Sequence, residues 1–404
     1  MSSVNDIPKG WEETTLGDVS TRKQYGYTES ASTEEIGPRF LRITDIQNDF
    51  INWKSVPFCP ISDSDLEKYK LQIGDVVIAR TGNSTGATAT IKENINAVFA
   101  SYLIRFQINK DIADYNFIDF LVRSRLWSGF VKSVKSGSAQ GGANANDFAL
   151  FPINLPTLPE QKAIANILTA FDDKIENLQA QNKTLEQTAQ TIFKEWFGKY
   201  QVGDELPDGW RVGKLGELVD STSGGTPSRK KEVFYLNGKY NWVKSKELNG
   251  TFIIETEEKI TEEGLKKSSA KIFPSNSILL AMYGNTVGEY ALVSKPMTCN
   301  QAVCALIPNE KIPFTYLFFL IKNLKAEFIN NSIGSAQQNI SQVLIKNTNV
   351  IYSDIMISKF HSISEPLMNK ILNNAQQIQT LKKTRDTLLP RLMSGQLRVN
   401  EFKD

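Results

Sequence analysis

The chain contains an internal repeat with a period near 200 residues, and this repeat restricts the folds that the chain can adopt. Three short motifs occur twice, always in the same order, and the second copy follows the first after 197 to 202 residues. The pairs are 7–11 with 206–210 (Ile-Pro-Lys-Gly-Trp and Leu-Pro-Asp-Gly-Trp), 82–86 with 284–288 (Gly-Asn-Ser-Thr-Gly and Gly-Asn-Thr-Val-Gly), and 137–140 with 334–337 (Gly-Ser-Ala-Gln in both). Collinear matches of this kind indicate that the 404 residues hold two copies of one structural unit.

Each copy begins with a part that mixes short strands and helices. Apolar residues that alternate with polar ones, or that form short runs, predict the strands, and a helical spacing of apolar residues follows them. The predicted strands are 40–46, 76–79, 98–108, 277–282 and 302–307, and the predicted helices are 116–132 and 314–330. The fold class expected for these parts is α+β.

Each copy ends in a long predicted helix whose apolar residues follow a heptad repeat, the pattern of a coiled coil. The first helix is expected at 159–197, which contains no proline after its first residue and no glycine. Its a positions are Ile164, Phe171, Leu178, Leu185 and Ile192, and its d positions are Leu168, Ile175, Asn182, Ala189 and Trp196. The second helix is expected at 359–393, where Pro366 in the first turns favours a delayed start. Its a positions are Phe360, Leu367, Asn374, Leu381 and Leu388, and its d positions are Ser364, Ile371, Ile378, Arg385 and Leu392.

Each long helix carries an apolar seam that it cannot bury alone, and the other long helix is the simplest partner. An antiparallel pair with Asn182 opposite Asn374 lets the two amides hydrogen-bond to each other. The same register places Leu178 against Ile378, Ile175 against Leu381 and Leu168 against Leu388. The alternative is that each helix packs only on its own globular part.

The composition excludes several classes of protein. Hydrophobic residues make up 41% and charged residues 22%, which is too apolar for a disordered chain. A net charge of +2 excludes a strongly basic coat for non-specific nucleic-acid binding, although local basic patches stay open. His361 and the three cysteines, Cys59, Cys299 and Cys304, are too few and too scattered for a zinc site. Without a signal peptide or an apolar run of about 20 residues, the chain is expected to be soluble and cytoplasmic, with reduced thiols.

Several stretches resemble the specificity subunits of type I restriction-modification systems. The most specific is 155–175, where Leu-Pro-Thr-Leu-Pro-Glu-Gln leads into the first long helix, and 388–399 resembles the closing segment of the family. The stretch 223–228 (Ser-Gly-Gly-Thr-Pro-Ser) and the Gly-Ser-Ala-Gln motifs resemble parts of the family's recognition domains. The segment 351–365 before the second helix lacks the Leu-Pro-x-Leu-Pro-Glu-Gln form, so no helix-start role is carried over to it.

The resemblance implies two target recognition domains, at 1–155 and 201–355, each reading one half of a bipartite, asymmetric DNA target. It implies that segments 156–200 and 356–404 form an antiparallel coiled coil in a pseudo-two-fold, circular organisation. These helices would set the gap between the half-sites and dock two methyltransferase (modification) subunits, and motor-nuclease (restriction) subunits would complete the complex. The methyltransferase would use S-adenosylmethionine, while this chain would hold no cofactor or metal and have no enzymatic activity.

Candidate DNA contacts are hydrogen-bonding side chains in predicted loops or at strand ends. In the first copy they are Lys23, Tyr25 and Tyr27 of a basic-aromatic loop, Arg42 and Thr44 of a predicted strand, Arg80, Asn83 and Ser84 at the glycine loop, and Lys132, Lys135, Ser138 and Gln140. In the second copy they are Ser228, Arg229, Lys230, Lys231, Lys244, Lys246, Tyr283, Asn285, Thr286, Gln337 and Gln338. The alternative is ordinary solvated surface for each side chain, and a tight turn within the fold for the glycine loops.

The sequence offers no convincing catalytic motif. It lacks the phosphate-binding loop of ATPases and the Gly-x-Gly-x-x-Gly of dinucleotide-binding proteins. Residues 154–157 (Asn-Leu-Pro-Thr) hold only part of an amino-methyltransferase motif, and Asp208 with Glu257 and Lys259 makes a poor nuclease triad because Asp208 belongs to a repeated turn. The sequence favours a DNA-reading adaptor. The alternatives are a nucleic-acid-processing enzyme, the detached half of a methyltransferase–nuclease fusion, and a coiled-coil scaffold without a DNA role.

Overall fold

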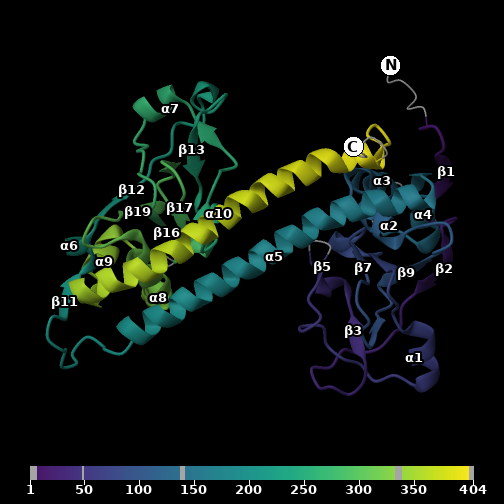
Figure 1. The fold of residues 1–404 in the computed structure, drawn as a ribbon, viewed down its shortest axis with the longest axis horizontal. Coiled ribbons are helices and arrows are strands. Elements are labelled where there is room, and N and C mark those ends of the chain that lie inside the picture. Colours follow the sequence, from purple (N-terminus) through teal and green to yellow (C-terminus); the bar gives the residue numbers. More distant parts are fainter. Residues whose placement is uncertain (1–6, 48–49, 137–141, 333–338, 400–404) are drawn as a thin grey trace. The chain divides into compact units, whose positions relative to one another are not determined.

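The computed structural model describes residues 7–47, 50–136, 142–332 and 339–399 (Figure 1). The chain forms two compact units: unit 1 comprises Met1–Lys174 and Leu381–Asp404, and unit 2 comprises Ile175–Thr380. The boundary between them crosses both long helices, so each unit contains one segment of each helix. The finer division of the chain at residues 155, 200 and 355 stays a prediction.

The globular part of unit 1 is built on a four-stranded antiparallel sheet. Its strands are β1 (Glu12–Thr15), β2 (Ser20–Tyr25), β3 (Arg39–Leu41), β4 (Ile46–Gln47), β5 (Phe50–Ile51), β6 (Asp75–Ala79), β7 (Thr88–Thr90), β8 (Ala97–Phe99), β9 (Leu103–Ile108) and β10 (Pro152–Leu155), and its helices are α1 (Asp63–Tyr69), α2 (Tyr115–Val122), α3 (Arg125–Ser136) and α4 (Ala145–Ala149). The sheet has the order β2-β9-β6-β7. In β6, Val76 and Ile78 enter one apolar core while Val77 and Ala79 enter another. Because alternate residues of a strand face opposite sides, this apolar run implies a sheet covered on both faces.

The globular part of unit 2 repeats this plan with one more strand in the sheet. Its strands are β11 (Arg211–Lys214), β12 (Asp220–Ser223), β13 (Tyr240–Val243), β14 (Phe252–Ile253), β15 (Lys259–Ile260), β16 (Ile278–Ala281), β17 (Tyr290–Val293), β18 (Thr298–Cys299), β19 (Val303–Ile307) and β20 (Asn349–Tyr352), and its helices are α6 (Leu215–Leu218), α7 (Glu262–Lys266), α8 (Phe314–Ser332) and α9 (Gln342–Asn347). The larger sheet has the order β12-β19-β16-β17-β14. A second sheet has the order β15-β13-β18.

The two units share one topology, and this confirms the predicted duplication. In each unit the first strand pairs antiparallel with the strand that leads into the long helix, β1 with β10 and β11 with β20. A parallel pair also recurs, as β3 with β8 and β13 with β18. Equivalent backbone hydrogen bonds run from Gly26 to Leu103, from Gly224 to Val303, from Arg80 to Tyr102 and from Met282 to Ala302. Arg80 and Met282 therefore occupy equivalent places in the two copies.

The two long helices are α5 (Leu158–Phe197) and α10 (Asp354–Met393), each of 40 residues. The helix α5 begins one residue before the predicted 159 and ends at 197 as predicted, but α10 begins five residues before the predicted 359 and continues through Pro366. The delayed start was wrong because Ile357 and Phe360 are buried in the core of unit 2 and hold the first turns in place. Pro366 itself is exposed, and burial of these side chains outweighs the loss of one helical hydrogen bond.

The heptad seams are covered along both helices, since every predicted a and d residue is buried or half-buried. In unit 2, Asn374 Nδ2 donates to Asn182 Oδ1 at 2.9 Å, as predicted, and the rings of Phe360 and Trp196 lie 6.4 Å apart in the same register. In unit 1, Arg385 at a d position of α10 forms an ion pair of 2.5 Å with Asp172 of α5. The segments are therefore antiparallel within each unit, while one continuous coiled coil stays a prediction.

The hydrogen bond between Asn182 and Asn374 is expected to contribute to the free energy of unfolding of unit 2. Asn374 is fully buried, so Asn182→Ala leaves its amide with only a long contact of 3.5 Å to Gln181 Oε1. In a double-mutant cycle with Asn374→Ala, we expect a coupling energy of about 0.5–3 kcal/mol from urea unfolding. Thr188→Ala, at an exposed position of the same helix, is the control and should combine additively with Asn374→Ala. Additive losses for the two asparagines would contradict the pairing.

The prediction of a single strand at 40–46 is wrong. The backbone N–H and the guanidinium of Arg42 donate to the Asp45 carboxylate at 2.9–3.0 Å, and these bonds close a 3₁₀ turn at Ile43–Asp45. Thr44 lies in this turn rather than on a strand. A local side-chain interaction thus overrides the period-two pattern.

Two other predicted elements are each divided in two. The stretch 98–108 forms β8 and β9, because the Leu103 N–H donates to the Ala100 carbonyl at 2.8 Å in a tight turn. The stretch 116–132 forms α2 and α3, because the Ser124 hydroxyl accepts from the Trp127 N–H and starts a new helix. Apolar periodicity continues through both breaks and therefore hides them.

The three cysteines are buried and unpaired. Burial raises the pKa of the Cys59 and Cys304 thiols to about 11, and it raises the pKa of Cys299 as well. Among the described residues, no group of three or more His, Cys, Asp or Glu side chains is placed to hold a metal ion. Every helix in the described part of the chain is too short or too polar to cross a bilayer.

Candidate nucleic-acid interface

The first glycine loop connects β6 to β7 and packs on α3. Gly82 and Gly86 have φ values of +68° and +87°, which favour glycine, and a Cβ on Gly86 would lie 2.4 Å from a methyl group of Val131. The Trp127 indole donates to the Gly86 carbonyl at 2.7 Å. The glycines are thus needed for the turn, and the turn leaves Asn83 exposed.

A hollow of about 360 Å³ lies beside this loop in unit 1. Four of the predicted contacts, Asn83, Ser84, Lys132 and Lys135, line it together with Trp127. Amide, hydroxyl and ammonium groups are donors that phosphate oxygens accept from. The structure therefore gathers residues that are about 50 positions apart in the sequence around one hollow, and contact of each with DNA stays a prediction.

Tyr25 and Arg80 form a second group in unit 1. The Arg80 guanidinium lies over the Tyr25 ring, 5.1 Å from its centre, and its Nε donates to the Ser101 carbonyl at 3.1 Å. The Tyr25 hydroxyl accepts from the Ala145 N–H at 3.1 Å. These contacts hold an arginine beside the glycine loop, since Arg80 precedes it by two residues.

The predicted contacts Lys23, Tyr25 and Tyr27 do not lie in an exposed loop. The prediction of a basic-aromatic loop is wrong, because Lys23 and Tyr25 lie on β2, where Lys23 pairs with Phe106 of β9. Tyr27 is half-buried and packs against Tyr69 with ring centres 5.3 Å apart. Burial raises the pKa of the Tyr27 hydroxyl.

Four predicted contacts from the two copies lie outside the described residues: Ser138, Gln140, Gln337 and Gln338.

The second glycine loop has the same conformation as the first. Gly284 and Gly288 have φ values of +70° and +79°, and Gly284–Thr286 forms a 3₁₀ turn like that at Gly82–Ser84. Tyr283 is 46% exposed at the start of the loop, and its carbonyl accepts from the Thr286 hydroxyl at 3.2 Å. The predicted residues Tyr283, Asn285 and Thr286 are thus brought together at one exposed turn.

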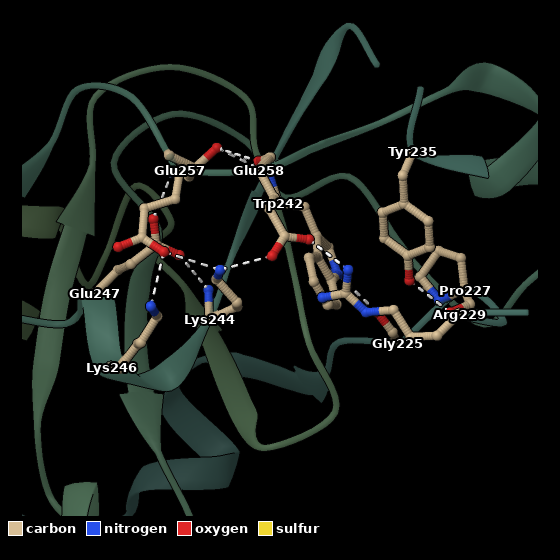
Figure 2. Close-up of polar contacts among 11 residues, drawn as sticks. Gly225, Pro227, Arg229, Tyr235, Trp242, Lys244, Lys246, Glu247, Glu257 and Glu258 are labelled. Atoms are coloured by element: carbon tan, nitrogen blue, oxygen red, sulfur yellow. Dashed lines mark hydrogen bonds and ion pairs between the residues drawn. The ribbon is translucent and has the colours of Figure 1, made fainter. Parts of the chain in front are cut away.

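Three predicted cations of unit 2 are paired with glutamates, and we call this group the charged cluster (Figure 2). Its cations are Arg229, Lys244 and Lys246, and its carboxylates are Glu247, Glu257 and Glu258. Arg229 contacts Glu258 at 2.5 Å, Lys244 contacts Glu258 at 2.8 Å and Glu257 at 3.0 Å, and Lys246 contacts Glu257 at 2.8 Å. These hydrogen bonds lower the pKa of both Glu257 and Glu258. The sequence analysis missed these partners, because nothing in the local pattern links residues 229 and 258.

The remaining predicted contacts at 228–231 flank Arg229 in the sequence. Ser228, Lys230 and Lys231 are exposed, and the Lys231 ammonium lies 5.2 Å from the centre of the Phe234 ring. Ser228 ends the stretch 223–228, and the two lysines follow Arg229.

Sequence reasoning also missed two groups of charged residues that join elements of unit 1. In the first, Arg123 of α2–α3 bonds both Asp119 at 3.0 Å and Asp172 of α5 at 3.3 Å. In the second, Arg398 and the Trp11 indole both donate to Glu160 at the start of α5, at 2.7–3.2 Å. The second group could have been predicted from the Leu-Pro-Glu-Gln motif, because its Glu160 accepts the hydrogen bonds from Arg398 and Trp11.

The next residue of that motif fixes the start of α5 on the globular part of unit 1. The Gln161 side chain is fully buried. Its amide donates to the carbonyls of Ile112 and Pro156, at 3.0 and 2.8 Å, and its Oε1 accepts from the Asp114 N–H at 2.8 Å. The Gln161 amide is thus satisfied as both donor and acceptor, and these bonds fix the start of α5 on the globular part of unit 1.

Comparison with known proteins agrees with the two-copy architecture. The family model described as "Type I restriction modification DNA specificity domain" matches residues 8–187 and 207–381. The chain is 30% identical to the type I restriction enzyme MjaIX specificity subunit of Methanocaldococcus jannaschii, over 99% of this chain and 96% of the relative. It is 24% identical to the HindI specificity subunit of Haemophilus influenzae, over 96% of this chain and 99% of the relative. The solved S subunit of a type I restriction-modification system from M. genitalium has the same fold, with a TM-score of 0.65 and 17% identity over 97% of this chain and 98% of that one.

Proposed function

The chain belongs to the type I restriction-modification DNA specificity family, and we propose that the globular part of each unit reads one half of a bipartite, asymmetric DNA target. The observation that carries this proposal is that the globular parts of the two units share one topology but have different side chains at equivalent positions. Arg80 of unit 1 is replaced by Met282 in unit 2, and Tyr25, which precedes Gly26, is replaced by Ser223, which precedes Gly224. Since base edges are distinguished by the donors and acceptors that meet them, two such surfaces read different sequences.

We propose that α5 and α10 hold the two reading surfaces at a fixed separation. A 40-residue helix spans roughly 60 Å, and major-groove segments one turn apart are separated by roughly 34 Å. The helices are therefore long enough to set the gap between half-sites. Their exposed faces would dock two methyltransferase subunits, and motor-nuclease subunits would join to form the restriction complex in the cytoplasm.

We propose that this chain reads DNA without catalysing a reaction, and that S-adenosylmethionine is used by the methyltransferase partner. The purified chain with DNA, Mg²⁺ and S-adenosylmethionine should leave the DNA uncut and unmethylated. The same chain assembled with methyltransferase subunits should methylate adenines at one bipartite sequence, mapped by sequencing that detects methylated bases. Turnover by this chain alone would favour an enzyme, and an assembled complex without target-specific binding would favour a scaffold.

Arg80 is expected to contribute to binding of the half-site read by unit 1. Its guanidinium is held over Tyr25 beside the glycine loop, so Arg80→Ala removes a positioned cationic donor. Binding of the target by the assembled complex should weaken about tenfold, since a good arginine contact is worth about 1–3 kcal/mol. Lys110→Ala removes an exposed cation away from this group and serves as the control. Equal affinities of the Arg80→Ala complex and the control in a filter-binding titration would show that Arg80 does not contribute to DNA binding.

A further inference from the structure

The side chain of Arg229 is held from three sides in unit 2. Its guanidinium lies 4.4 Å from the centre of the Tyr235 ring and 4.9 Å from the centre of the Trp242 ring. Its Nη1 donates to Glu258 Oε2 at 2.5 Å (Figure 2). Stacking restrains the plane of the guanidinium, and the hydrogen bond restrains its rotation within that plane.

The two aromatic rings are themselves fixed to the backbone just before Arg229. The Trp242 indole donates to the Gly225 carbonyl at 3.0 Å, and the Tyr235 hydroxyl donates to the Pro227 carbonyl at 2.6 Å. A Cβ on Gly225 would lie 2.3 Å from the backbone of Ser269, so only glycine fits there. The stretch 223–228 is therefore a rigid support that ends where the arginine begins.

Arg229 is nevertheless accessible, because 52% of its side-chain surface is exposed. Among the described residues, only Glu258 accepts a hydrogen bond from its guanidinium, through Nη1. The edge formed by Nε and Nη2 thus keeps two parallel N–H donors. A guanine presents two acceptors, O6 and N7, side by side in the major groove, and an arginine edge matches them.

The charge of the cluster argues against a role in phosphate binding. Each of its three cationic groups contacts Glu257 or Glu258, and the third carboxylate, Glu247, accepts from the backbone N–H groups of Lys244 and Glu257. Phosphate contacts depend on net positive charge that displaces counterions, and this group supplies none. Both Glu258 oxygens accept from the cations of the cluster, Oε2 from Arg229 and Oε1 from Lys244.

We propose that Arg229 is a specificity-determining residue that reads a guanine in the half-site of unit 2, and that Glu258, Tyr235 and Trp242 are positioning residues that hold it. The proposal rests on the DNA-reading function proposed above. It deepens that function by naming one base and the residue that recognises it.

The test uses the complete chain assembled with methyltransferase subunits and a DNA library randomised at both half-sites. Sequencing of the methylated molecules gives the base preference at each position for the wild type and for the variants. Arg229→Ala should reduce the preference for guanine at one position of one half-site by roughly ten- to a hundredfold and leave the other half-site unchanged. Arg229→Lys keeps the charge but not the two-donor edge, so it should relax the same position. Glu258→Gln should relax that position to a smaller extent.

The other outcomes overturn the proposal in recognisable ways. A phosphate contact would give weaker binding of every sequence with Arg229→Ala, restoration by Arg229→Lys, and a shallower dependence of affinity on salt. A purely structural arginine would lower the melting temperature of Arg229→Ala and leave the base preferences of Arg229→Lys unchanged. Lys267→Ala, which removes a 63% exposed cation paired with Glu263, is the matched control and should keep the wild-type profile. A wild-type complex without any target preference would instead refute the proposed function.

Discussion

Duplicating one heptad in each long helix is expected to lengthen the gap between the two half-sites by about three base pairs and to leave both half-sites unchanged. Seven residues add about 10.5 Å to a helix, and each base pair adds about 3.4 Å to the DNA. The duplicated segments are residues 175–181 of α5 and 375–381 of α10. They contribute matched apolar layers in the register of Asn182 with Asn374, so the helix pair continues through the insertion.

Methylation mapping of the assembled complex measures this effect directly. The original target should lose methylation almost completely, because two reading surfaces can no longer meet both half-sites at once. The control inserts seven flexible residues at Gly203, in the exposed turn after α5, where the helix length is unchanged. That variant should keep the original gap. An unchanged gap in the heptad variant would show that the helices do not set the spacing.

Phe193→Ala is expected to destabilise unit 2 strongly. The Phe193 ring is 1% exposed and lies within about 6 Å, centre to centre, of four other aromatic rings. They belong to Phe197, Tyr316, Phe319 and Phe360, from α5, α8 and α10. Truncation leaves a cavity among rigid rings that cannot close it, so the free energy of unfolding should fall by about 3–5 kcal/mol.

A thermal melt followed by circular dichroism should show the loss as a decrease in Tm of roughly 10 °C or more for the transition of unit 2. Lys194→Ala, the adjacent but exposed position of α5, should leave that transition within a degree or two of the wild type. A similar small shift for Phe193→Ala would mean that α5 and α8 do not pack together in unit 2.

The long helices could be predicted from the sequence because their signal is long and local. Thirty-nine residues without an interruption, with apolar residues at heptad spacing, leave no other regular structure for 159–197. The asparagine pair followed from the same spacing, since a polar residue in each seam must find a partner. The start of α10 could not be predicted, because burial of Ile357 and Phe360 depends on the core of unit 2 rather than on the residues around Pro366.

The candidate interface was predicted only in part. Both glycine loops were found because the duplication preserved them, and they place Asn83 and Asn285 at equivalent turns. The glutamates that pair with Arg229 and Lys244 were missed, since they come from a strand connection that lies 29 residues after Arg229 and 13 to 14 residues after Lys244. The sequence around a lysine or arginine does not show whether a carboxylate from elsewhere in the chain will pair with it. The ion pairs of a charged surface therefore become visible only in the folded structure.

The contacts of Glu160 have a consequence for how the chain is made. Unit 1 is assembled from Met1–Lys174 and Leu381–Asp404, and Arg398 reaches Glu160 and the Lys9 carbonyl to close it. Unit 2 consists of the single stretch Ile175–Thr380 between these parts. During synthesis, the larger part of unit 1, Met1–Lys174, therefore emerges from the ribosome before the segment that completes it, and all of unit 2 is made in between. A prematurely terminated chain would hold a finished second unit and an open first one, which makes the open unit a natural target for chaperones and proteases.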